Sequence, residues 1–432
     1  MCSVVLNGDT TFTLTQTKVA IPRKLMISDS RSLFSFLARQ VDTFVKQHHS
    51  DHFAEDPDHR LHLGFTFSFP VDQKAINKGY LIRWTKGFDI PDAIGKDVCA
   101  LLQNEIDALD LPVNVAALVN DTVGTLMARS YTSPGETGTL LGAIFGTGTN
   151  GAYVEGLERV SKMTASKDAG EYDSRTGEMV VNTEWGSFDN ALHVLPDTPY
   201  DRAVDANSFN PGIQMFEKRV SGMFLGEILR NAILKLMDSA GLFSTVTVSP
   251  KSSLYTPWGI DTSLLSHIES DTGVDLSSTK HHLSTHLSIP ACSTEDAQSV
   301  KTLVHAIGRR SARLSAVPIA AIFLATGKFS SPPPTRLSLV GQTIQMLKSV
   351  FRFTQPLPPK SAPQEEIIDV GVDGSVVEFY PNFEGHLRTA IAEVPEIGAA
   401  GVGRMRMGVA KDGSGVGAAL IALVAERASR TT

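Results

Sequence analysis

The sequence has little cysteine, no long apolar run and no leader-like start. Its three cysteines, Cys2, Cys99 and Cys292, lie far apart and form no C-x-x-C motif, so we expect free thiols in a reducing compartment. No uninterrupted apolar run reaches the ~20 residues that a transmembrane helix needs. Residues 1–20 alternate apolar and polar side chains and lack the apolar core of a signal peptide. The sequence therefore predicts a cytoplasmic protein without membrane insertion.

Basic clusters and several catalytic motifs are also missing. The net charge is −7 and the pI is near 6.0, and no lysine- or arginine-rich block occurs, which argues against nucleic acid and anionic membranes as partners. The chain has no G-x-x-x-x-G-K-[ST], H-E-x-x-H or G-x-S-x-G motif, which argues against P-loop NTPases, zinc proteases and α/β-hydrolases. The neighbouring histidines at 48–52 and 281–286 lie in polar stretches and are interpreted as surface residues.

The chain does have the length and composition of a globular protein with two or three domains: 432 residues, 42% hydrophobic. Strand and helix patterns alternate without a short repeat, which indicates an α/β or α+β fold. Residues 2–6 and 11–20 are predicted as two strands that the turn Asn7-Gly8-Asp9 joins in a hairpin. Further predicted strands cover 61–70, 113–119, 139–150 and 405–410, with a second hairpin at 367–379. Predicted helices cover 93–109, 122–131, 211–229, 301–324, 384–394 and 418–429, whereas 71–91 and 411–417 are predicted as a loop lobe and a glycine-rich turn.

Residues 329–365 fit neither pattern, because they are rich in proline. A loop this long is uncommon inside a compact domain, and proline-rich composition favours extended or disordered structure. We expect poor order in this segment, apart from a helical fragment near 342–350.

The stretch from Val113 to Thr125 organises the rest of the chain. Its apolar first half is typical of a buried strand, and residues 122–131 have helical spacing. Asn120 and Asp121 therefore lie where a strand passes into a helix, which is where α/β sheets usually bind ligands. At this point the alternative that Asp121 only caps the helix stays open, because aspartate is a favoured N-cap residue.

The string Gly146-Thr-Gly-Thr-Asn-Gly151 matches G-x-G-x-x-G. The dinucleotide-binding form of this motif needs a strand before it and a helix after it. Residues 152–155 look like another strand, so the motif is interpreted as a β-turn. Such a turn can still wrap a phosphate with backbone N–H groups and a threonine hydroxyl.

Several polar residues suit a ligand with many hydroxyl groups, because carboxylates and amides match groups that both donate and accept hydrogen bonds. Glu184 is notable, since it follows an apolar run in V-V-N-T-E-W-G and burying a carboxylate without partners is costly. The candidates are Ser68, Thr85, Lys86, Asn120, Asp121, Asn150, Glu184 and Glu217.

Seven separated motifs contain most of these candidates. They are L-G-F-T-F-S-F-P at 63–70, R-W-T-K-G-F-D-I-P at 83–91, V-N-D-T-V-G-T at 119–125, F-G-T-G-T-N-G at 145–151, N-T-E-W-G-S-F-D-N at 182–190, G-V-D-G-S at 371–375 and D-G-S-G-V-G-A-A at 412–419. In this order they resemble the motifs of the eukaryotic hexokinase family, and most closely its fungal glucokinase branch. The resemblance covers nearly all of the chain except 329–365.

The resemblance implies the α/β, actin-like (ribonuclease H-like) hexokinase fold, with two domains around a cleft for sugar and ATP. Residues 1–119 plus 414–432 would form the small domain and 120–413 the large one, with 329–365 as an insert that has no counterpart in the family. The implied activity is phosphoryl transfer from Mg-ATP to the 6-hydroxyl of glucose, the entry step of glycolysis.

Residue roles follow from the same resemblance. Asp121 matches the family's catalytic base, which makes a role as cap alone a minor alternative, and Lys86 would bring positive charge to the reacting oxygen. The family's sugar contacts match Ser68, Phe69, Thr85, Lys86, Asn120, Asp121, Asn150, Glu184 and Glu217. Its ATP contacts fall at Thr147, Gly222, Thr262, Ser266, Gly374, Ser375 and Ser414. ATP and Mg²⁺ are the implied cofactors, and no side chain is assigned to the metal.

The chain departs from the family at its start and at the insert. The family carries a glycine-rich phosphate loop, of the form D-L-G-G-T-N, after the first strand of its smaller domain, and residues 1–6 line up with the strand that follows this loop. The ATP phosphates would then lack a backbone cradle, and the neighbouring strands would expose unpaired N–H and C=O groups. The two departures predict an incorrectly assembled gene model, which sequencing the transcript's 5′ end and the junction near 328 would test.

Two functions therefore stay open. An ATP-dependent glucose kinase is favoured by Asp121, whereas a catalytically impaired glucose-binding regulator is favoured by the missing phosphate loop. An NAD-linked oxidoreductase built on residues 146–151 fails on its structural context. The sequence does not discriminate glucose from fructose or mannose, or a monomer from a homodimer.

Overall fold

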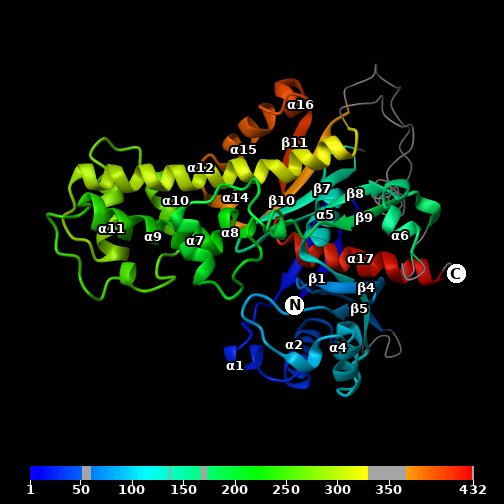
Figure 1. Cartoon of the computed structure of the whole chain (residues 1–432). Helices are drawn as coiled ribbons and strands as arrows, with labels where there is room; N and C mark the ends of the chain where they lie inside the picture. The colour runs from blue at the N-terminus through cyan, green and yellow to red at the C-terminus, as the bar shows by residue number, and fades with distance from the viewer. Residues whose placement is uncertain (51–59, 136–137, 167–171, 173, 329–365, 431–432) are drawn as a thin grey trace.

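The computed structural model describes residues 1–50, 60–135, 138–166, 172, 174–328 and 366–430. Two α/β bodies lie on either side of the C-terminal helix α17 (Gly413–Arg430), and an arm of helices extends from the larger body along the long helix α12 (Thr294–Ala325) (Figure 1). The insert predicted at 329–365, with its expected poor order and its helical fragment near 342–350, lies outside the described residues. Within the described part of the chain, no helix is both long and apolar enough to cross a membrane.

The larger body is built on a five-stranded mixed sheet with the order β11-β10-β7-β8-β9. Strand β10 (Ile368–Asp373) runs parallel to β7 (Thr139–Phe145) and β11 (Met405–Val409), and β8 (Thr149–Gly156) and β9 (Glu178–Asn182) continue the sheet antiparallel. The inner strands β7 and β10 are almost completely buried. Burial on both faces explains why their sequences are continuously apolar rather than alternating.

Helices cover both faces of this sheet. On one face, α5 (Asp121–Thr132) packs so closely that a Cβ atom on Gly142 of β7 would lie 2.5 Å from the backbone nitrogen of Leu126. Leu141 and Phe145 of β7 belong to the core on the other face, which contains α12 and α15 (Phe383–Ala392). The other helices of this body are α6 (Ser161–Thr164), α7 (Pro199–Ala206), α8 (Glu217–Val220), α9 (Gly222–Ala240), α10 (Ser263–Glu269), α11 (Ser277–Leu287), α14 (Ser375–Phe379) and α16 (Gly398–Arg404). Short 3₁₀ turns lie at Leu157–Arg159, Ser174–Thr176, Trp185–Ser187 and Ser253–Tyr255.

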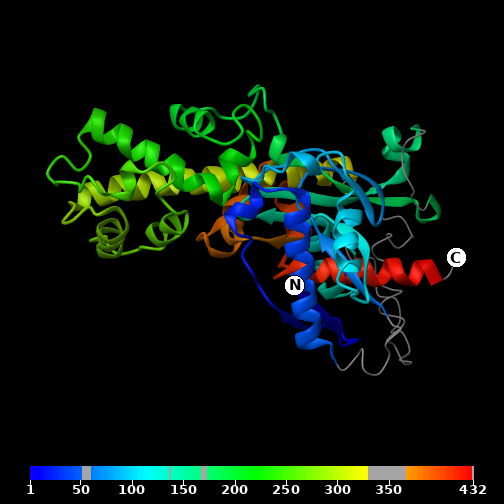
Figure 2. The ribbon, with the colours of Figure 1, turned by 90° about the horizontal axis from the view of Figure 1, so that it is seen from below.

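The smaller body has its own core, formed by residues of α2, α4 and two pairs of strands. Figure 2 shows the ribbons of this body in blue and cyan. Its elements are α1 (Arg23–Met26), α2 (Ser30–His48), β3 (Leu61–Thr66), β4 (Val71–Ala75), β5 (Lys78–Leu81), a 3₁₀ turn at Pro91–Ala93, α4 (Val98–Asp107) and β6 (Val113–Val119). Strands β3 and β6 are parallel, and β4 and β5 form a hairpin. The loop predicted over 71–91 is therefore wrong in its first half. Strand β4 shows no clear alternation of apolar and polar side chains, because its adjacent residues Asp72 and Gln73 are both exposed.

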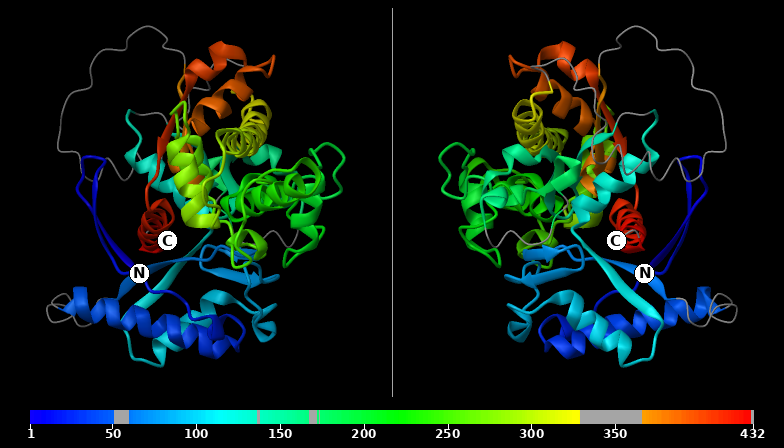
Figure 3. Two further views of the ribbon diagram at one scale, coloured as in Figure 1. Left: turned by 90° about the vertical axis from the view of Figure 1, so that its left-hand side faces the viewer. Right: turned by 90° about the vertical axis from the view of Figure 1, so that its right-hand side faces the viewer.

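The predicted N-terminal hairpin is confirmed: β1 (Cys2–Leu6) pairs antiparallel with β2 (Phe12–Gln16). Its apolar side packs against Val416 and Leu420 of α17. Figure 3 shows the ribbon of the hairpin beside this helix. The hairpin and the β3–β6 pair are separate two-stranded sheets. Two cavities of about 310 and 390 Å³ lie between them, lined by residues of β1, β3, α2 and α17. Among the described residues, β1 and β3 each have one hydrogen-bonded strand partner.

The glycine-rich turn predicted at 411–417 is confirmed only for its first two residues and is wrong from Gly413, where α17 begins. The glycines serve a close helix crossing instead. A Cβ atom on Gly417 would lie 1.9 Å from the carbonyl oxygen of Gly124 in α5, and one on Gly124 would lie 2.7 Å from the carbonyl oxygen of Ser414. Tertiary packing therefore overrides the low helix propensity of glycine at this position.

Two further predictions are wrong. The hairpin predicted at 367–379 is a strand followed by helix α14, and Gly374 between them has a φ of 117°. The helix predicted at 211–229 begins only at Glu217 and is broken between α8 and α9 at Ser221, whose ψ of 154° is extended. A strand-to-helix turn and a one-residue break both leave the local apolar pattern intact, so periodicity does not reveal them.

Candidate active site

A cavity of about 470 Å³ is lined by residues of both bodies. Its walls come from the end of β6, the β7–β8 turn, the β10–α14 turn and the loops around residues 68–70, 85–86, 184–187 and 214–217. Carboxyl ends of sheet strands are where α/β proteins usually bind ligands. All eight polar candidates for a hydroxyl-rich ligand line this one cavity: Ser68, Thr85, Lys86, Asn120, Asp121, Asn150, Glu184 and Glu217.

The start of α5 separates the roles of Asn120 and Asp121. Asn120 is the N-cap residue, and its Oδ1 accepts hydrogen bonds from the backbone N–H (3.0 Å) and the hydroxyl (2.6 Å) of Thr122. Asp121 is the first residue of the helix, where a carboxylate is favoured by the helix dipole. Its Oδ1 also accepts from Thr122 N–H, at 2.9 Å. Since Asn120 caps the helix, capping alone does not explain an aspartate that faces the cavity.

Lys86 enters the cavity from the smaller body. Its Nζ donates to the carbonyl oxygen of Ser68 at 3.1 Å and lies 5.7 Å from the centre of the Phe69 ring. Phe69, predicted as a sugar contact, is not among the residues that line the cavity. Its ring packs against those of Trp84 and Phe88 at centroid distances of 4.8 and 5.1 Å. Phe69 thus supports the loop that carries Thr85 and Lys86.

Glu217, at the start of α8, is more deeply buried than Glu184, the other glutamate of the cavity. Its Oε2 accepts a hydrogen bond of 2.9 Å from the backbone N–H of Thr149. Burial raises the pKa of Glu217, although this hydrogen bond and the charge of Lys86 oppose the rise. A Cβ atom on Gly148 would lie 2.7 Å from Oε2. Glycine at this position of the G-x-G-x-x-G string therefore makes room for the carboxylate.

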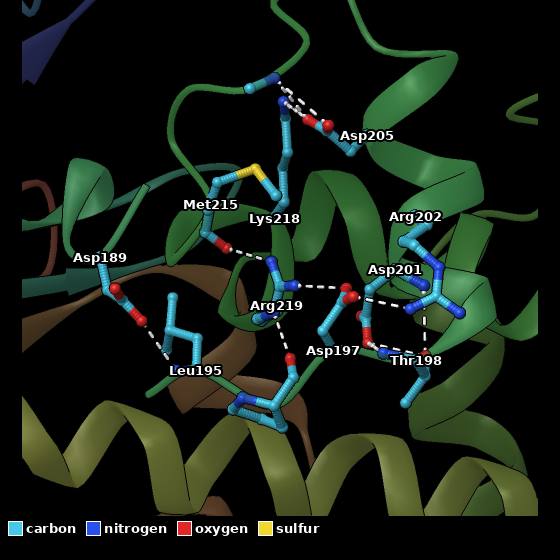
Figure 4. A network of polar contacts seen from close by, with 12 residues as sticks. Asp189, Leu195, Asp197, Thr198, Asp201, Arg202, Asp205, Met215, Lys218 and Arg219 are labelled. Atoms are coloured by element: carbon cyan, nitrogen blue, oxygen red, sulfur yellow. Dashed lines mark hydrogen bonds and ion pairs between the residues drawn. The ribbon is translucent and has the colours of Figure 1, made fainter. Parts of the chain in front are cut away.

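Two buried cations hold the residues that follow Glu217 (Figure 4). Lys218 and Arg219 are only 2% and 1% exposed. Lys218 Nζ lies 2.6 Å from Asp205 Oδ1, and Arg219 pairs with Asp197 at 3.0 Å and donates to two backbone carbonyl groups. Buried charges need such partners, and here the partners lie on α7 and on the segment before it. This network fixes α8 and therefore the backbone of Glu217.

Glu184 is exposed, unlike the buried carboxylate that its apolar neighbours suggested. Its Oε1 accepts hydrogen bonds from the side-chain amides of Asn182 (2.7 Å) and Asn150 (3.2 Å). Trp185, the next residue, is fully buried and donates to the Thr149 hydroxyl at 3.0 Å. The apolar character of the segment thus belongs to the buried tryptophan, while Glu184 points to the cavity that it lines.

The predicted nucleotide contacts fall into three groups. Thr147, Gly374 and Ser375 line the cavity. Gly222 donates its N–H to the carbonyl oxygen of Gly146 at 2.8 Å. The Thr262 hydroxyl bonds to the carbonyl oxygen of Gly222, and Ser266 lies one turn further along α10. Ser414 lies in α17, where its carbonyl oxygen accepts from the Thr66 hydroxyl at 3.2 Å, and lines the neighbouring cavity of about 390 Å³.

The side chains available as metal ligands determine how the cavity could hold a metal ion. In the described part of the chain, no group of three or more histidine, cysteine or acidic side chains could hold a metal ion. Magnesium is commonly bound by one or two carboxylates together with phosphate oxygens and water. Asp121 and Asp373 both line the cavity, and burial raises the pKa of Asp373. These residues fit a Mg²⁺ that arrives with a nucleotide.

Sequence reasoning did not single out several cavity residues as ligand contacts: Thr149, Ser187, Gln214 and Asp373. Gln214 shares an uncommon feature with Lys86 and Glu184. Their φ angles are 56°, 58° and 50°, in the left-handed region that side chains disfavour. Such strain costs ~1–3 kcal/mol per residue and is concentrated at functional sites. A positive φ at glycine or asparagine has a sequence signal, but at lysine, glutamate or glutamine it has none.

Comparisons with known proteins agree with this geometry. Two family models described as hexokinase match residues 1–131 and 140–424. A glucokinase of Aspergillus niger is 57% identical over 99% of this chain and 83% of its own length, and Glucokinase-1 of Saccharomyces cerevisiae is 43% identical over 98% and 82%. The structure of a Schistosoma mansoni hexokinase complexed with glucose aligns with a TM-score of 0.75 at 30% identity, over 98% of this chain and 82% of that one. The actin-like α/β fold expected from the motifs is confirmed, and the chain belongs to the hexokinase family.

Proposed function

We propose that this chain is an ATP-dependent hexose kinase that phosphorylates the 6-hydroxyl of glucose in the cytoplasm. The observation that carries the proposal is the gathering of eight polar candidates, from both bodies, around one cavity that also contains the β7–β8 and β10–α14 turns. Similarity to proteins named glucokinase over nearly the whole chain supports it. Residues 1–119 with 414–432 would act as the small domain, and 120–413 as the large one.

In this proposal each polar residue has a chemical task. Asp121 accepts the proton of the 6-hydroxyl as its oxygen attacks the γ-phosphoryl group. Lys86 stabilises negative charge that develops near this oxygen. The sugar is held by Ser68, Thr85, Asn120, Asn150, Glu184 and Glu217, with Phe69 supporting from behind. Closure of the two bodies on the sugar would exclude water, which otherwise competes as the phosphoryl acceptor.

The nucleotide would lie at the end of the cavity formed by the two turns. Backbone N–H groups and hydroxyls at Thr147, Gly374 and Ser375 are suited to phosphate oxygens. Gly222, Thr262 and Ser266 continue toward the start of α10, and Ser414 approaches from α17. Mg²⁺, when bound with ATP, would neutralise phosphate charge, with Asp121 and Asp373 as the carboxylates available to it.

The experiment that tests the proposal measures turnover and binding side by side. We expect glucose 6-phosphate formation in a coupled assay with glucose and Mg-ATP, and saturable glucose binding by calorimetry. Binding without turnover would overturn the kinase in favour of a glucose-binding regulator. The same assay with fructose and mannose gives the sugar preference, and sedimentation of the active protein gives its oligomeric state.

Glucose affinity is expected to fall as the pH is lowered, because of Glu217. Burial raises the pKa of this carboxyl above its ordinary 4.5, so protonation begins at a higher pH than for an exposed glutamate. The ionised form accepts hydrogen bonds from sugar hydroxyls, and protonation replaces one acceptor by a donor. Calorimetric titration of glucose at a series of pH values checks this. Glu217→Gln should weaken binding about 10- to 100-fold and remove this pH dependence. An affinity that stays constant down to pH 4.5 would contradict it.

A further inference from the structure

Asn182 stands out as a polar residue that contacts two cavity residues without lining the cavity itself. It is the last residue of β9, where it lies opposite Ala152 of β8. Its side-chain Oδ1 accepts from Asn150 Nδ2 at 2.8 Å, and its Nδ2 donates to Glu184 Oε1 at 2.7 Å. The Thr122 hydroxyl, which bonds to Asn120, lies 3.4 Å from the same Oδ1. Asn182 thus connects two proposed sugar contacts, Asn150 in β8 and Glu184 in the turn after β9.

The backbone N–H of Gly151 determines which group donates and which accepts in this series of hydrogen bonds. The backbone N–H of Gly151 donates to Asn150 Oδ1 at 2.8 Å, and the Thr183 hydroxyl approaches that oxygen at 3.3 Å. Because a backbone N–H can only donate, the Asn150 amide must present its Nδ2 to Asn182 and Glu184. Asn182 must then accept on one side and donate on the other. The asparagine amide supplies both groups at this distance from the backbone, whereas an ionised aspartate would only accept.

The hydrogen bond from Asn182 to Glu184 is the strongest that Asn182 makes. A hydrogen bond to an ionised carboxylate is about twice as strong as one between neutral groups. Glu184 has a φ of 50° and an exposed side chain, so the backbone and the core do little to hold its carboxylate in place. The Asn182 and Asn150 amides are the donors that orient Oε1.

We propose that Asn182 is a positioning residue for sugar binding, which holds Asn150 and Glu184 in the orientation that their hydroxyl partners require. The inference rests on the proposed function, since it takes the ligand of this cavity to be a hexose. It predicts weaker glucose binding and a higher KM for glucose when the Asn182 amide is lost. The KM for ATP should change little, because Asn182 contacts none of the proposed nucleotide residues.

The test is Asn182→Asp, which keeps the shape of the side chain and replaces the donor by a carboxylate facing Glu184. At mildly alkaline pH the two carboxylates repel, and we expect glucose to bind about 10- to 100-fold more weakly than to the wild type. As the pH falls, the introduced carboxyl is protonated and regains a donor. The ratio of the variant and wild-type dissociation constants should therefore shrink toward one. Asn182→Leu, which cannot regain a donor, should show a ratio that stays large at every pH.

A matched control is Asn231→Asp. Asn231 Nδ2 also donates to a glutamate carboxylate, Glu227 Oε1 at 3.1 Å, but neither residue lines the cavity. This variant should leave glucose affinity unchanged at all pH values. A pH-independent ratio for Asn182→Asp, or wild-type affinity in both Asn182 variants, would overturn the positioning role while leaving the kinase proposal intact. Absence of glucose binding by the wild type would instead overturn the proposed function, and this inference with it.

Discussion

Replacing Asp121 by alanine is expected to abolish most turnover while glucose still binds. A general base contributes about 100- to 10,000-fold to a rate, so kcat should fall by that factor. Asp121 contributes few of the cavity's polar groups, and its neighbours Asn120, Asn150, Glu184 and Glu217 remain to hold the sugar. The coupled assay measures kcat, and calorimetry with glucose measures binding. An unchanged kcat would defeat the assignment of Asp121 as the base.

A cap residue of the smaller body provides the control. Asp97 is the N-cap of α4, and its Oδ1 accepts from the backbone N–H of Cys99 at 3.1 Å. The acceptor role resembles that of Asp121 toward Thr122, but Asp97 does not line the cavity. Asp97→Ala should cost about 0.5–2 kcal/mol of stability, as lost caps do, with kcat unchanged. If Asp121 served only the helix, Asp121→Ala would behave in the same way.

Replacing Asp369 by alanine is expected to destabilise the larger body by about 3–5 kcal/mol, the usual cost of leaving a buried charge without its partner. Asp369 lies in β10 and is 0% exposed. Its carboxylate accepts two hydrogen bonds from Arg129, at 2.8 and 2.7 Å, one from Arg406 at 2.5 Å and one from the Thr139 hydroxyl at 2.8 Å. The variant would leave the guanidinium group of Arg129 buried beside β10. Thermal and urea unfolding measure the loss.

The control for this variant is an ion pair of similar length at the surface. Glu384 Oε1 lies 2.6 Å from Arg388 one helical turn later, and the two side chains are 50% and 30% exposed. Exposed pairs of this kind contribute about 0.3–0.5 kcal/mol, so Glu384→Gln should shift the unfolding midpoint only slightly. If Asp369→Ala shifted the unfolding midpoint no further than Glu384→Gln, the buried network would not stabilise the larger body. The urea dependence should be fitted to each transition separately, since a protein of two bodies need not unfold in one step.

Local sequence predicted a large part of this architecture. The Asn7-Gly8 turn with flanking alternation predicted the first hairpin, and the apolar run before Asn120 predicted a buried strand that ends at the cavity. Both depend on residues that are close in sequence, whose hydrogen bonds and burial follow directly from spacing. The polar candidates were also found in this way, because motifs at strand ends place ligand-binding side chains whatever the rest of the chain does.

The tertiary structure alone decided the features that depend on contacts between distant segments. Residues 413–417 are helical because their glycines allow α17 to cross α5, which no local propensity indicates. Asn182 gained its contact with Asn150 from β8, and Lys218 and Arg219 were buried by partners on and before α7. From the residues alone, the family, most of the elements and the residues offered to a ligand could be predicted. Which of them meet, and which groups hold them in place, was decided only by packing, because the partners lie tens to hundreds of residues apart in the chain.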